Sequence, residues 1–407
     1  MTARAWIADR LVTCALEFAT KGNELGVIDR GVLVTESGRC TYVGPEHGAP
    51  ISATDCMQAS VITPGLLDAH THACWVGSRH DEYVLRMAGA DYREIAARGG
   101  GIVASSCALE STLLDDIAYT LYRRLCRMAS LGVTTVEVKS GYGLLPELEE
   151  RQLQAIRMAS EMPNAPHVIP TFLGLHAIPP AYLRRRDDYI AEVVNTVLPR
   201  VAPLARFVDA YVDANAFAPD EARLLAQGGM AKNLGVRLHV GQFADVGGAE
   251  LAAELGASSV DHMEHVSDIG ISALASAGVP IALLPTASFT LGQAAPNIAA
   301  FRRANIALIV ASDANPGTAP SESLPLAMAL AMRLYALRPE EIWLGVTRFA
   351  ALSLGEPNRG ALHVGNFADY VVWDAPHEHA LLQPWGVSRA RYVAREGVAL
   401  HGVLSAG

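Results

Sequence analysis

The chain has 407 residues, of which 51% are hydrophobic and only 18% charged, so it can bury a sizeable core. That length accommodates a barrel of about 250 residues with a smaller satellite domain. The formal net charge of −10 argues against nucleic acid or an anionic membrane surface as the main partner. No apolar run reaches the roughly 18 residues of a membrane span, and no signal-peptide pattern opens the chain. We therefore expect a cytoplasmic protein without a membrane partner.

All six cysteines lie in the first third of the chain and none forms a Cys-x-x-Cys pair. A chain of this size does not need covalent cross-links to hold a core together. Free thiols are therefore predicted at every position: Cys14, Cys40, Cys56, Cys74, Cys107 and Cys126.

The two ends of the chain share one sequence pattern. Residues 1–62 contain short β-type runs at 27–28, 31–35 and 40–44, separated by glycine and proline, and the tail repeats this at 370–373 and 391–393. This pattern predicts a small composite β-sandwich domain built from residues 1–62 and 358–407. Residues 63–357 then form a catalytic barrel domain.

The middle of the chain alternates apolar runs with helical patterns such as Leu148–Ser160 and Ala249–Leu255. Eight candidate strands lie near 61–68, 133–139, 168–175, 206–212, 236–241, 258–262, 279–285 and 306–312. Strands that alternate with helices form a parallel sheet, and eight of them in order predict an α/β fold of the (β/α)₈ TIM-barrel type.

Polar residues gather where these apolar runs stop, which is where barrel enzymes carry their active sites. The residues concerned are His70, His72, Lys139, Ser140, Tyr142, His176, His239, Gln242, His262, Asp313 and Asn315. Four strands that deliver histidine to one rim are hard to explain by packing alone.

His70 and His72 belong to the Asp-Ala-His-Thr-His run at 68–72. Because they are two residues apart on a strand, their imidazoles share one face and can chelate one cation at about 2.0–2.1 Å. His239 and Asp313 end two later strands and complete a set of three imidazoles and one carboxylate. This set predicts one divalent ion with an open position for water, either Zn²⁺ or iron (Fe²⁺/Fe³⁺).

Several motifs across residues 60–325 make the chain resemble the imidazolonepropionases, a family of the amidohydrolase superfamily. The motifs are Pro64-Gly-Leu-Leu-Asp-Ala-His-Thr-His72, Gly77-Ser-Arg79, Arg98-Gly-Gly-Gly-Ile102, Lys139-Ser-Gly-Tyr-Gly-Leu144, Thr171-Phe-Leu-Gly-Leu-His-Ala-Ile-Pro179, Gly247-Gly-Ala-Glu-Leu-Ala252 and Ser312-Asp-Ala-Asn-Pro-Gly317. The resemblance implies hydrolysis of 4-imidazolone-5-propanoate, a small anionic cyclic amide, to N-formimidoyl-L-glutamate in histidine degradation. A homodimer is also expected.

The resemblance also implies a role in the reaction for several residues. Asp313 would carry a proton from water to the leaving ring nitrogen, and His262 would hold the carbonyl oxygen. Arg79 would grip the propanoate carboxylate, because its planar fork suits a bidentate pair. The other substrate-binding positions implied are Tyr92, Tyr142, His176, Gln242, Asn315, Gly317 and Thr318. Gln242 is also expected among the catalytic residues, with Asp313 and His262.

Two features separate the chain from other members of the superfamily. Many mononuclear deaminases carry His-x-x-Glu after strand five, whereas this chain has His239-Val-Gly-Gln242. Glutamine can donate a hydrogen bond but cannot shuttle a proton, which disfavours aminohydrolysis of purines and pyrimidines. Binuclear members use a carboxylated lysine on strand four, and the strand at 206–212 has none, so one ion is predicted.

Three positions depart from the family pattern: Val212-Asp213, Val240-Gly241 and His265. A surface residue at the start of a helix is the ordinary interpretation of His265. An alternative substrate is therefore kept open, namely another five-membered cyclic amide with a propanoate arm, such as a hydantoin or thiohydantoin. A ligand-binding barrel with an incidental metal is disfavoured by the complete ligand set.

Overall fold

The computed structural model describes residues 4–52, 56–90, 94, 100–214, 216–383 and 386–403. One predicted substrate contact, Tyr92, lies outside these residues. Within them, no helix is both long enough and apolar enough to cross a membrane. All six cysteines carry free thiols, as predicted.

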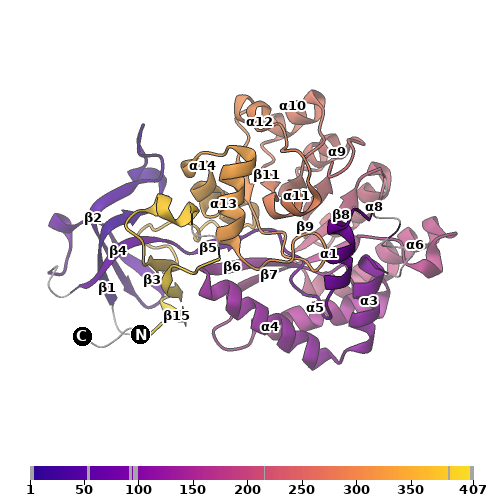
Figure 1. Ribbon diagram of the computed structural model, residues 1–407, viewed down its shortest axis with the longest axis horizontal. Coiled ribbons are helices and arrows are strands. Elements are labelled where there is room, and N and C mark those ends of the chain that lie inside the picture. Colours follow the sequence, from indigo (N-terminus) through magenta and orange to yellow (C-terminus); the bar gives the residue numbers. More distant parts are fainter. Residues whose placement is uncertain are drawn as a thin grey trace.

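Strands from both ends of the chain form one seven-stranded sheet, at the left of Figure 1. In spatial order they are β15 (Val398–His401), β14 (Ala390–Arg395), β13 (Tyr370–Trp373), β4 (Met57–Pro64), β1 (Arg4–Val12), β2 (Val27–Glu36) and β3 (Arg39–Pro45). β1 and β4 are parallel, and the other neighbours are antiparallel. The terminal segments thus build one β-structure together, as predicted from their shared sequence pattern.

The terminal sheet curls over its own apolar face. Trp6 of β1, Val43 of β3 and Tyr370 of β13 belong to one buried cluster, although these strands are far apart in the sheet order. The Trp6 indole donates a hydrogen bond to the Tyr370 hydroxyl over 3.1 Å. A bridge between Arg39 and Phe367 ties the edge strand back to the tail. Two layers therefore enclose one core. The domain boundaries at 62/63 and 357/358 stay a prediction.

The remaining eight strands are all parallel and follow chain order around a barrel. They are β5 (Leu66–Asp68), β6 (Val133–Lys139), β7 (His167–Leu175), β8 (Phe207–Val212), β9 (Gly235–Val240), β10 (Ser259–His262), β11 (Ile281–Leu283) and β12 (Leu308–Val310). The predicted α/β class and (β/α)₈ architecture are confirmed.

The barrel closes just beyond the carboxyl ends of β5 and β12. Ser312 donates to both oxygens of Asp68, from its backbone N–H over 3.0 Å and from its hydroxyl over 2.5 Å. A parallel bridge joins Thr71 to Ala314, and the His72 N–H donates to the Ala314 carbonyl over 3.0 Å. The first and last strands therefore meet at the residues that follow them.

Helices surround the barrel (Figure 1). Their bounds are α1 (His80–Met87), α3 (Ile102–Ser111), α4 (Leu114–Ser130), α5 (Pro146–Ser160), α6 (Arg186–Glu192), α7 (Leu198–Val201), α8 (Pro219–Met230), α9 (Gly248–Leu255), α10 (Asp268–Ala277), α11 (Pro285–Leu291), α12 (Ile298–Arg303), α13 (Leu324–Tyr335), α14 (Pro339–Gly345) and α15 (Arg348–Ser353). The predicted helices at 148–160 and 249–255 are α5 and α9.

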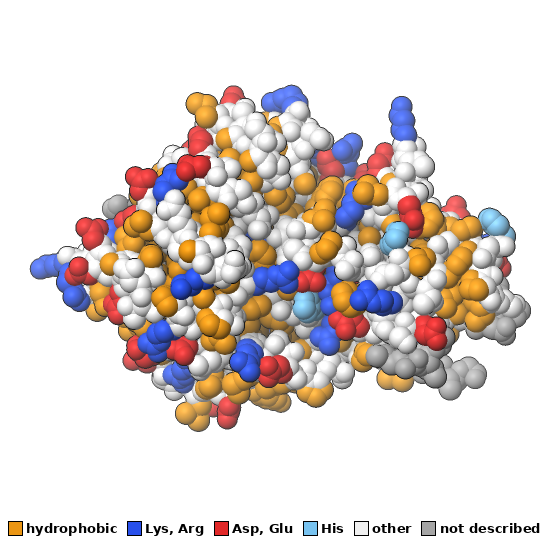
Figure 2. All heavy atoms as spheres, turned by 180° about the vertical axis from the view of Figure 1, so that it is seen from behind, with side chains coloured by type: hydrophobic (Ala, Val, Ile, Leu, Met, Phe, Trp, Pro, Cys, Tyr) orange, Lys and Arg blue, Asp and Glu red, His pale blue; other side chains and the backbone are white. Residues whose placement is uncertain are grey.

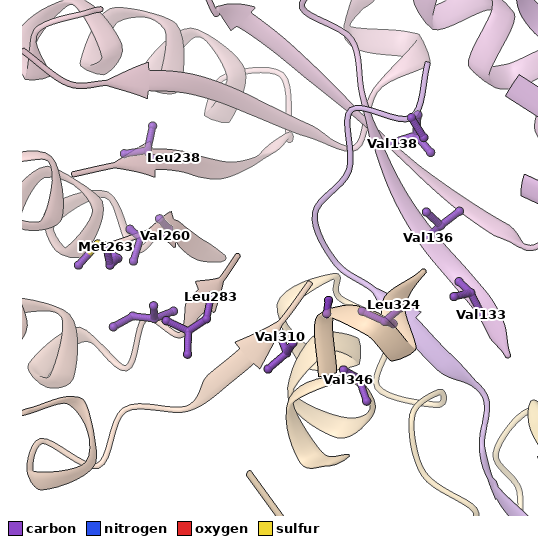
Figure 3. Close-up of a cluster of buried hydrophobic side chains, with 14 of the residues drawn as sticks. Val133, Val136, Val138, Leu238, Val260, Met263, Leu283, Val310, Leu324 and Val346 are labelled. Carbon is purple, nitrogen blue, oxygen red and sulfur yellow. The ribbon is translucent and has the colours of Figure 1, made fainter. Parts of the chain in front are cut away.

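Alternation along the strands separates an apolar outer layer from a polar interior. Val136 and Val138 of β6 belong to the large core cluster, and Figure 3 shows them together with Val260 and Val310 of other barrel strands. The side chains between them, such as Glu137, point to the opposite face because successive strand residues alternate. The strands thus present charged groups inside the barrel while their other face packs on the helices.

The predicted strand at 61–68 is in fact two strands that belong to different sheets. β4 ends at Pro64 and β5 begins at Leu66, so only Gly65 joins the terminal sheet to the barrel. A Cβ at Gly65 would lie 2.1 Å from the Thr134 hydroxyl oxygen, so a larger residue does not fit. The Pro64-Gly65 pair inside the predicted run was a signal of this break, and the prediction of a single strand did not use it.

Acidic and basic side chains are interspersed on the face shown in Figure 2, and neither sign forms a continuous field there. Orange apolar side chains lie between them, mostly as small groups. Mixed charge of this kind is typical of a solvated protein surface.

Candidate active site

Three buried histidines converge at the carboxyl ends of the barrel strands. His70 and His72 follow β5 and His239 lies in β9, and their ligand atoms lie within 4.8 Å of one another. The Nε2 atoms of His72 and His239 are 3.3 Å apart, and Asp313 Oδ1 lies 3.4 Å from His70 Nε2 and 3.5 Å from His72 Nε2. The structure thus brings all four predicted metal ligands together.

These separations fit one tetrahedral ion. Ligand atoms at about 2.0–2.1 Å from a central ion are about 3.3–3.4 Å from each other in a tetrahedron. His70 Nε2 and His72 Nδ1 are buried and have no hydrogen-bond partner among the described residues. Burial, the largest cause, holds the pKa of all three imidazoles well below its ordinary value, so they are neutral and can act as ligands. The donor set therefore suits a divalent ion.

Two carboxylates orient these imidazoles from behind. Asp261 Oδ2 lies 2.7 Å from His70 Nδ1, and Asp209 Oδ1 lies 3.1 Å from His239 Nδ1. A proton on each Nδ1 satisfies these contacts and leaves each Nε2 lone pair directed at the cluster. Such partners fix the tautomer and the ring orientation of a ligating histidine.

Lys139 links these carboxylates inside the barrel. Its ammonium lies 2.9 Å from Glu137 Oε1, 2.8 Å from Asp209 Oδ2 and 3.6 Å from Asp261 Oδ2, and its side chain is fully buried. Burial alone would lower the pKa of Lys139, but the surrounding carboxylates outweigh burial and raise it. A lysine that remains an ammonium cannot serve as a carboxylated metal bridge.

His262 ends β10 beside the cluster, and its side chain is 4% exposed. Its ring centroid lies 5.6 Å from that of His239 and 6.1 Å from that of His70. Burial raises the pKa of the nearby Asp313 carboxyl to about 7, although the charge of His262 opposes this rise. The geometry thus places a carboxyl and an imidazole next to the three neutral histidines.

Asn315 organises the loop that carries Asp313. Its side-chain oxygen accepts from the N–H groups of Gly317 and Thr318 over 2.8 and 2.7 Å. Its amide nitrogen donates to Asp313 Oδ2 over 3.0 Å and to the Thr318 hydroxyl over 2.9 Å. Both ends of the side chain are therefore engaged within the loop, where they orient the Asp313 carboxylate.

Arg79 reaches the same loop from the start of α1. Its guanidinium forms a two-pronged ion pair with the buried Glu82, with distances of 2.7–3.0 Å. A Cβ at Gly317 would lie only 2.7 Å from the guanidinium carbon, so the arginine packs on the bare glycine backbone. Arg79 also lines a cavity of about 550 Å³ with Trp75 and Pro316, so space for a small ligand adjoins it.

Two side chains of α5 hold the loop at 140–144 in place. Glu149 accepts from the N–H groups of Gly141 and Leu144 over 3.0 and 2.7 Å, and Gln152 accepts from that of Tyr142 over 3.1 Å. Gly141 has a φ of 100°, which suits glycine alone. This support presents the Tyr142 ring 6.1 Å from that of His72.

His176 stacks on His72, with a centroid distance of 5.3 Å and an interplanar angle of 21°. Its Nδ1 donates to the Gly141 carbonyl over 2.8 Å, which turns Nε2 away from that loop. Gln242 is held similarly, because its side-chain oxygen accepts from the Tyr211 hydroxyl over 2.7 Å. The amide N–H groups of Gln242 therefore remain available to donate hydrogen bonds.

Comparison with known proteins identifies the family. The family model described as the amidohydrolase family matches residues 61–403. A protein of Caulobacter vibrioides called imidazolonepropionase is 39% identical over 94% of this chain and 96% of its own length. One of Cereibacter sphaeroides with the same name is 41% identical over 93% and 97%. The chain belongs to the imidazolonepropionases of the amidohydrolase family.

Solved structures show the same fold at low identity. A triazine hydrolase of an Arthrobacter species superposes with a TM-score of 0.75 at 16% identity, over 99% of this chain and 95% of that one. An adenosine deaminase of Xanthomonas campestris with bound zinc gives a TM-score of 0.70 at 16% identity, over 97% and 92%. Both cover the terminal sheet as well as the barrel, so this chain shares its two-part fold with them.

The positions that depart from the usual imidazolonepropionase pattern are structural in this chain. Asp213 accepts from the N–H of Phe243 over 2.8 Å and thereby ties the loop after β9 to the end of β8. A Cβ at Gly241 would lie 2.1 Å from the His265 carbonyl oxygen, so this close contact requires glycine. His265 itself is exposed and precedes α10, in keeping with its interpretation as a surface residue.

Sequence reasoning missed several polar residues that hold the site. Glu82, Glu149, Gln152 and Glu264 were not predicted, although each is buried or nearly so and contacts a predicted site residue or its loop. Glu82 sits three residues after Arg79 at the start of α1, and an i,i+3 acid–base pair was a usable signal. Glu149 and Gln152 on α5 and Glu264 in the turn after β10 gave no such signal.

We predict that Gly317→Ala raises KM by roughly tenfold while kcat changes far less. The new methyl group must displace the Arg79 guanidinium, and a shift of that group weakens ground-state binding without touching the reacting atoms. Steady-state kinetics give the measurement. Gly228→Ala on α8 is the matched control, since its Cβ meets only the ends of two apolar side chains, those of Leu198 and Val194. Equal KM values in both variants would argue against the Arg79 grip.

Proposed function

We propose that the enzyme hydrolyses the lactam C–N bond of 4-imidazolone-5-propanoate and yields N-formimidoyl-L-glutamate, a step of histidine degradation. The observation that carries this proposal is the arrangement of one carboxylate and three neutral imidazoles beside Arg79, in a chain about 40% identical to imidazolonepropionases. A hydrolytic centre next to a carboxylate-binding arginine suits a small cyclic amide that carries a propanoate arm.

One divalent ion would be held by His70, His72, His239 and Asp313. When bound, such an ion acts as a Lewis acid and lowers the pKa of water so that a nucleophile forms near neutral pH. The interior supports a single ion, because Lys139 already neutralises the neighbouring Asp209 and Asp261 carboxylates. Zinc is the ion we propose, since a structural neighbour, an atrazine chlorohydrolase, is complexed with zinc and all four donors suit it.

The residues divide the reaction between them. Asp313 takes one proton of the attacking water and gives it to the ring nitrogen as the C–N bond breaks. The second proton of the water is released when the new carboxyl group ionises, so one water is consumed. His262 donates a hydrogen bond to the carbonyl oxygen, which becomes negative as water adds. The product is then an open chain with a new carboxylate.

The substrate is positioned by groups on several of the loops that follow the barrel strands. Arg79 pairs with the propanoate carboxylate, because Glu82 holds one edge of its guanidinium and the rest faces the cavity. Gln242 donates from its amide to the imidazolone ring, since its oxygen is already bound by Tyr211. Tyr142 and His176 border the ring from the side of His72. Tyr92, Asn315, Gly317 and Thr318 are kept as proposed substrate-binding positions.

Incubation of the metal-loaded enzyme with freshly prepared imidazolone propanoate tests the proposal. We expect loss of the imidazolone absorbance with equimolar appearance of formimidoylglutamate. Hydantoin-5-propanoate serves as the competing substrate, because Arg79 would bind its carboxylate equally well. Turnover of the hydantoin alone would replace the proposed substrate with that alternative, and turnover of neither would overturn the proposal.

Metal removal gives an independent prediction. Dialysis against a chelator is expected to abolish activity, and titration with Zn²⁺ should restore it at one equivalent per chain, because the four proposed ligands converge on one point. Metal analysis and activity are measured at each step. Recovery that requires two equivalents would contradict the single-ion site, and full activity of the chelated protein would contradict a metal role altogether.

We also propose that the enzyme is a homodimer and acts in the cytoplasm. Val84 and Met87 on α1 are exposed apolar side chains, which support a self-association surface on that helix. Light scattering coupled to size exclusion distinguishes the dimer mass from that of the single chain.

A further inference from the structure

Two buried polar atoms that lack a hydrogen-bond partner face each other beside the active site. His262 Nδ1 and Glu264 Oε2 are both fully enclosed, and neither has a partner among the described residues. They are 3.5 Å apart, and the two side chains are only 4% and 2% exposed. Since an unpaired buried polar atom is costly, a small closure that joins these two atoms satisfies both.

The backbone between them adopts a conformation that is rare for these residue types. His262 has a φ of 82° and Met263 a φ of 70°, a left-handed conformation that is unfavourable for residues other than glycine. Hydrogen bonds from the N–H of Met263 to Val240 over 3.0 Å and from that of His265 to Gly241 over 2.7 Å fix this turn. The fold thus maintains a strained turn that sets the Glu264 carboxylate next to the His262 ring.

The other oxygen of Glu264 is anchored to two helices. The Ser288 hydroxyl in α11 donates to Glu264 Oε1 over 2.9 Å. Since the single Ser288 proton is used there, the Tyr335 hydroxyl of α13 donates to Ser288 over 2.6 Å. This chain of contacts, from Tyr335 through Ser288 to Glu264, holds the carboxylate against rotation.

We propose that Glu264 is a positioning residue, which accepts a hydrogen bond from His262 Nδ1 and so directs the opposite ring nitrogen, Nε2, toward the reacting carbonyl. Ser288 and Tyr335 act through Glu264 in the same way. The inference deepens the proposed function, on which it rests, because it explains how His262 is held ready to donate to the oxygen that gains charge. Similar carboxylate partners set the tautomer of histidine elsewhere in this barrel, at Asp261 and Asp209.

A double-mutant cycle tests the coupling. Glu264→Gln is expected to lower kcat by at least about tenfold, whereas loss of the whole donor in His262→Ala costs about 10²–10³. KM and the metal content should change less than threefold, because Glu264 touches neither the ion ligands nor the substrate. The double variant should be no slower than His262→Ala, since Glu264 acts only through that ring. Equal effects of Glu264→Gln in both backgrounds would overturn the proposal.

A second pair of variants shows whether a lower kcat has any cause other than a general loss of stability. Ser288→Ala removes the anchor of Glu264 without touching any carboxylate and should lower kcat by about three- to tenfold. Ser353→Ala is the matched control, because Ser353 is a buried helix serine whose hydroxyl bonds only to the Ala350 carbonyl. The same loss in both variants would indicate general destabilisation and refute the anchor.

Nitrogen-15 spectra of the histidine rings in the zinc-loaded protein separate this inference from the proposed function. The resonances that disappear in His262→Ala assign the ring, and we expect a proton on Nδ1 in the wild type that is lost or redistributed in Glu264→Gln. This result stands whichever substrate the enzyme uses. An unprotonated Nδ1 in the wild type would overturn the positioning role even if imidazolone is the substrate.

Discussion

Asp313→Asn is expected to lower kcat by about 10²–10⁴, the usual contribution of a positioned general acid–base group. Asparagine keeps an oxygen at the position of Asp313 Oδ1 but cannot take up or release a proton. The three histidines still surround the ion, so the metal content should stay near one per chain. Kinetics and metal analysis of the same preparation therefore separate loss of the proton carrier from loss of the ion.

Asp245→Asn is the control for this variant, because Asp245 is an exposed carboxylate that bonds only to backbone N–H groups of Gly247 and Ser267. Its kcat should stay within about twofold of the wild type. An Asp313→Asn variant with near-normal kcat would show that another group carries the proton. A variant that has lost its ion would instead show that the carboxylate charge is needed for binding.

Lys139→Met is expected to destabilise the protein by about 3–5 kcal/mol, because removal of one partner leaves the others as uncompensated buried charges. Glu137, Asp209 and Asp261 would then share an interior without their cation. The His70 and His239 imidazoles would also lose their fixed orientation, since Asp261 and Asp209 hold them. Denaturant unfolding and zinc titration should show lower stability and weaker metal binding together.

Arg359→Met provides the comparison, because Arg359 is a buried cation that pairs with Asp369 and Glu396 in the terminal sheet, away from the ion ligands. It should lower stability without weakening zinc binding. If Lys139→Met behaves in the same way, Lys139 supports the fold alone. If it leaves stability unchanged, the three carboxylates do not need this cation.

The sequence predicted the barrel well because its signals are local. Short apolar runs mark the strands, and polar residues at their ends mark the rim, so β6, β8 and β9 fall close to their predicted ranges. The expected strand at 279–285 ends at Leu283 in the structure, since Pro285 already begins α11. Its apolar composition did not distinguish a strand from the first turn of the following helix.

The supporting contacts could not be predicted because their partners are remote in the chain. Lys139 and Asp209 are separated by 70 residues, and His70 and Asp261 by 191. Lys139 was noted at the end of its strand, but only the closed barrel shows that it is an internal counter-ion. Likewise, Glu264 lies next to the His262 ring because His262 and Met263 adopt positive φ angles, which a single sequence does not reveal.

The closure of the barrel between β5 and β12 has a consequence for biosynthesis. His70 and His72 leave the ribosome early, whereas Asp313 and its partner contacts to the first strand come more than 240 residues later. A nascent chain that lacks the last strand cannot close the barrel or complete the ligand set. The active centre therefore forms only after Asp313 has been synthesised, and β4 must wait still longer for β13, its antiparallel neighbour.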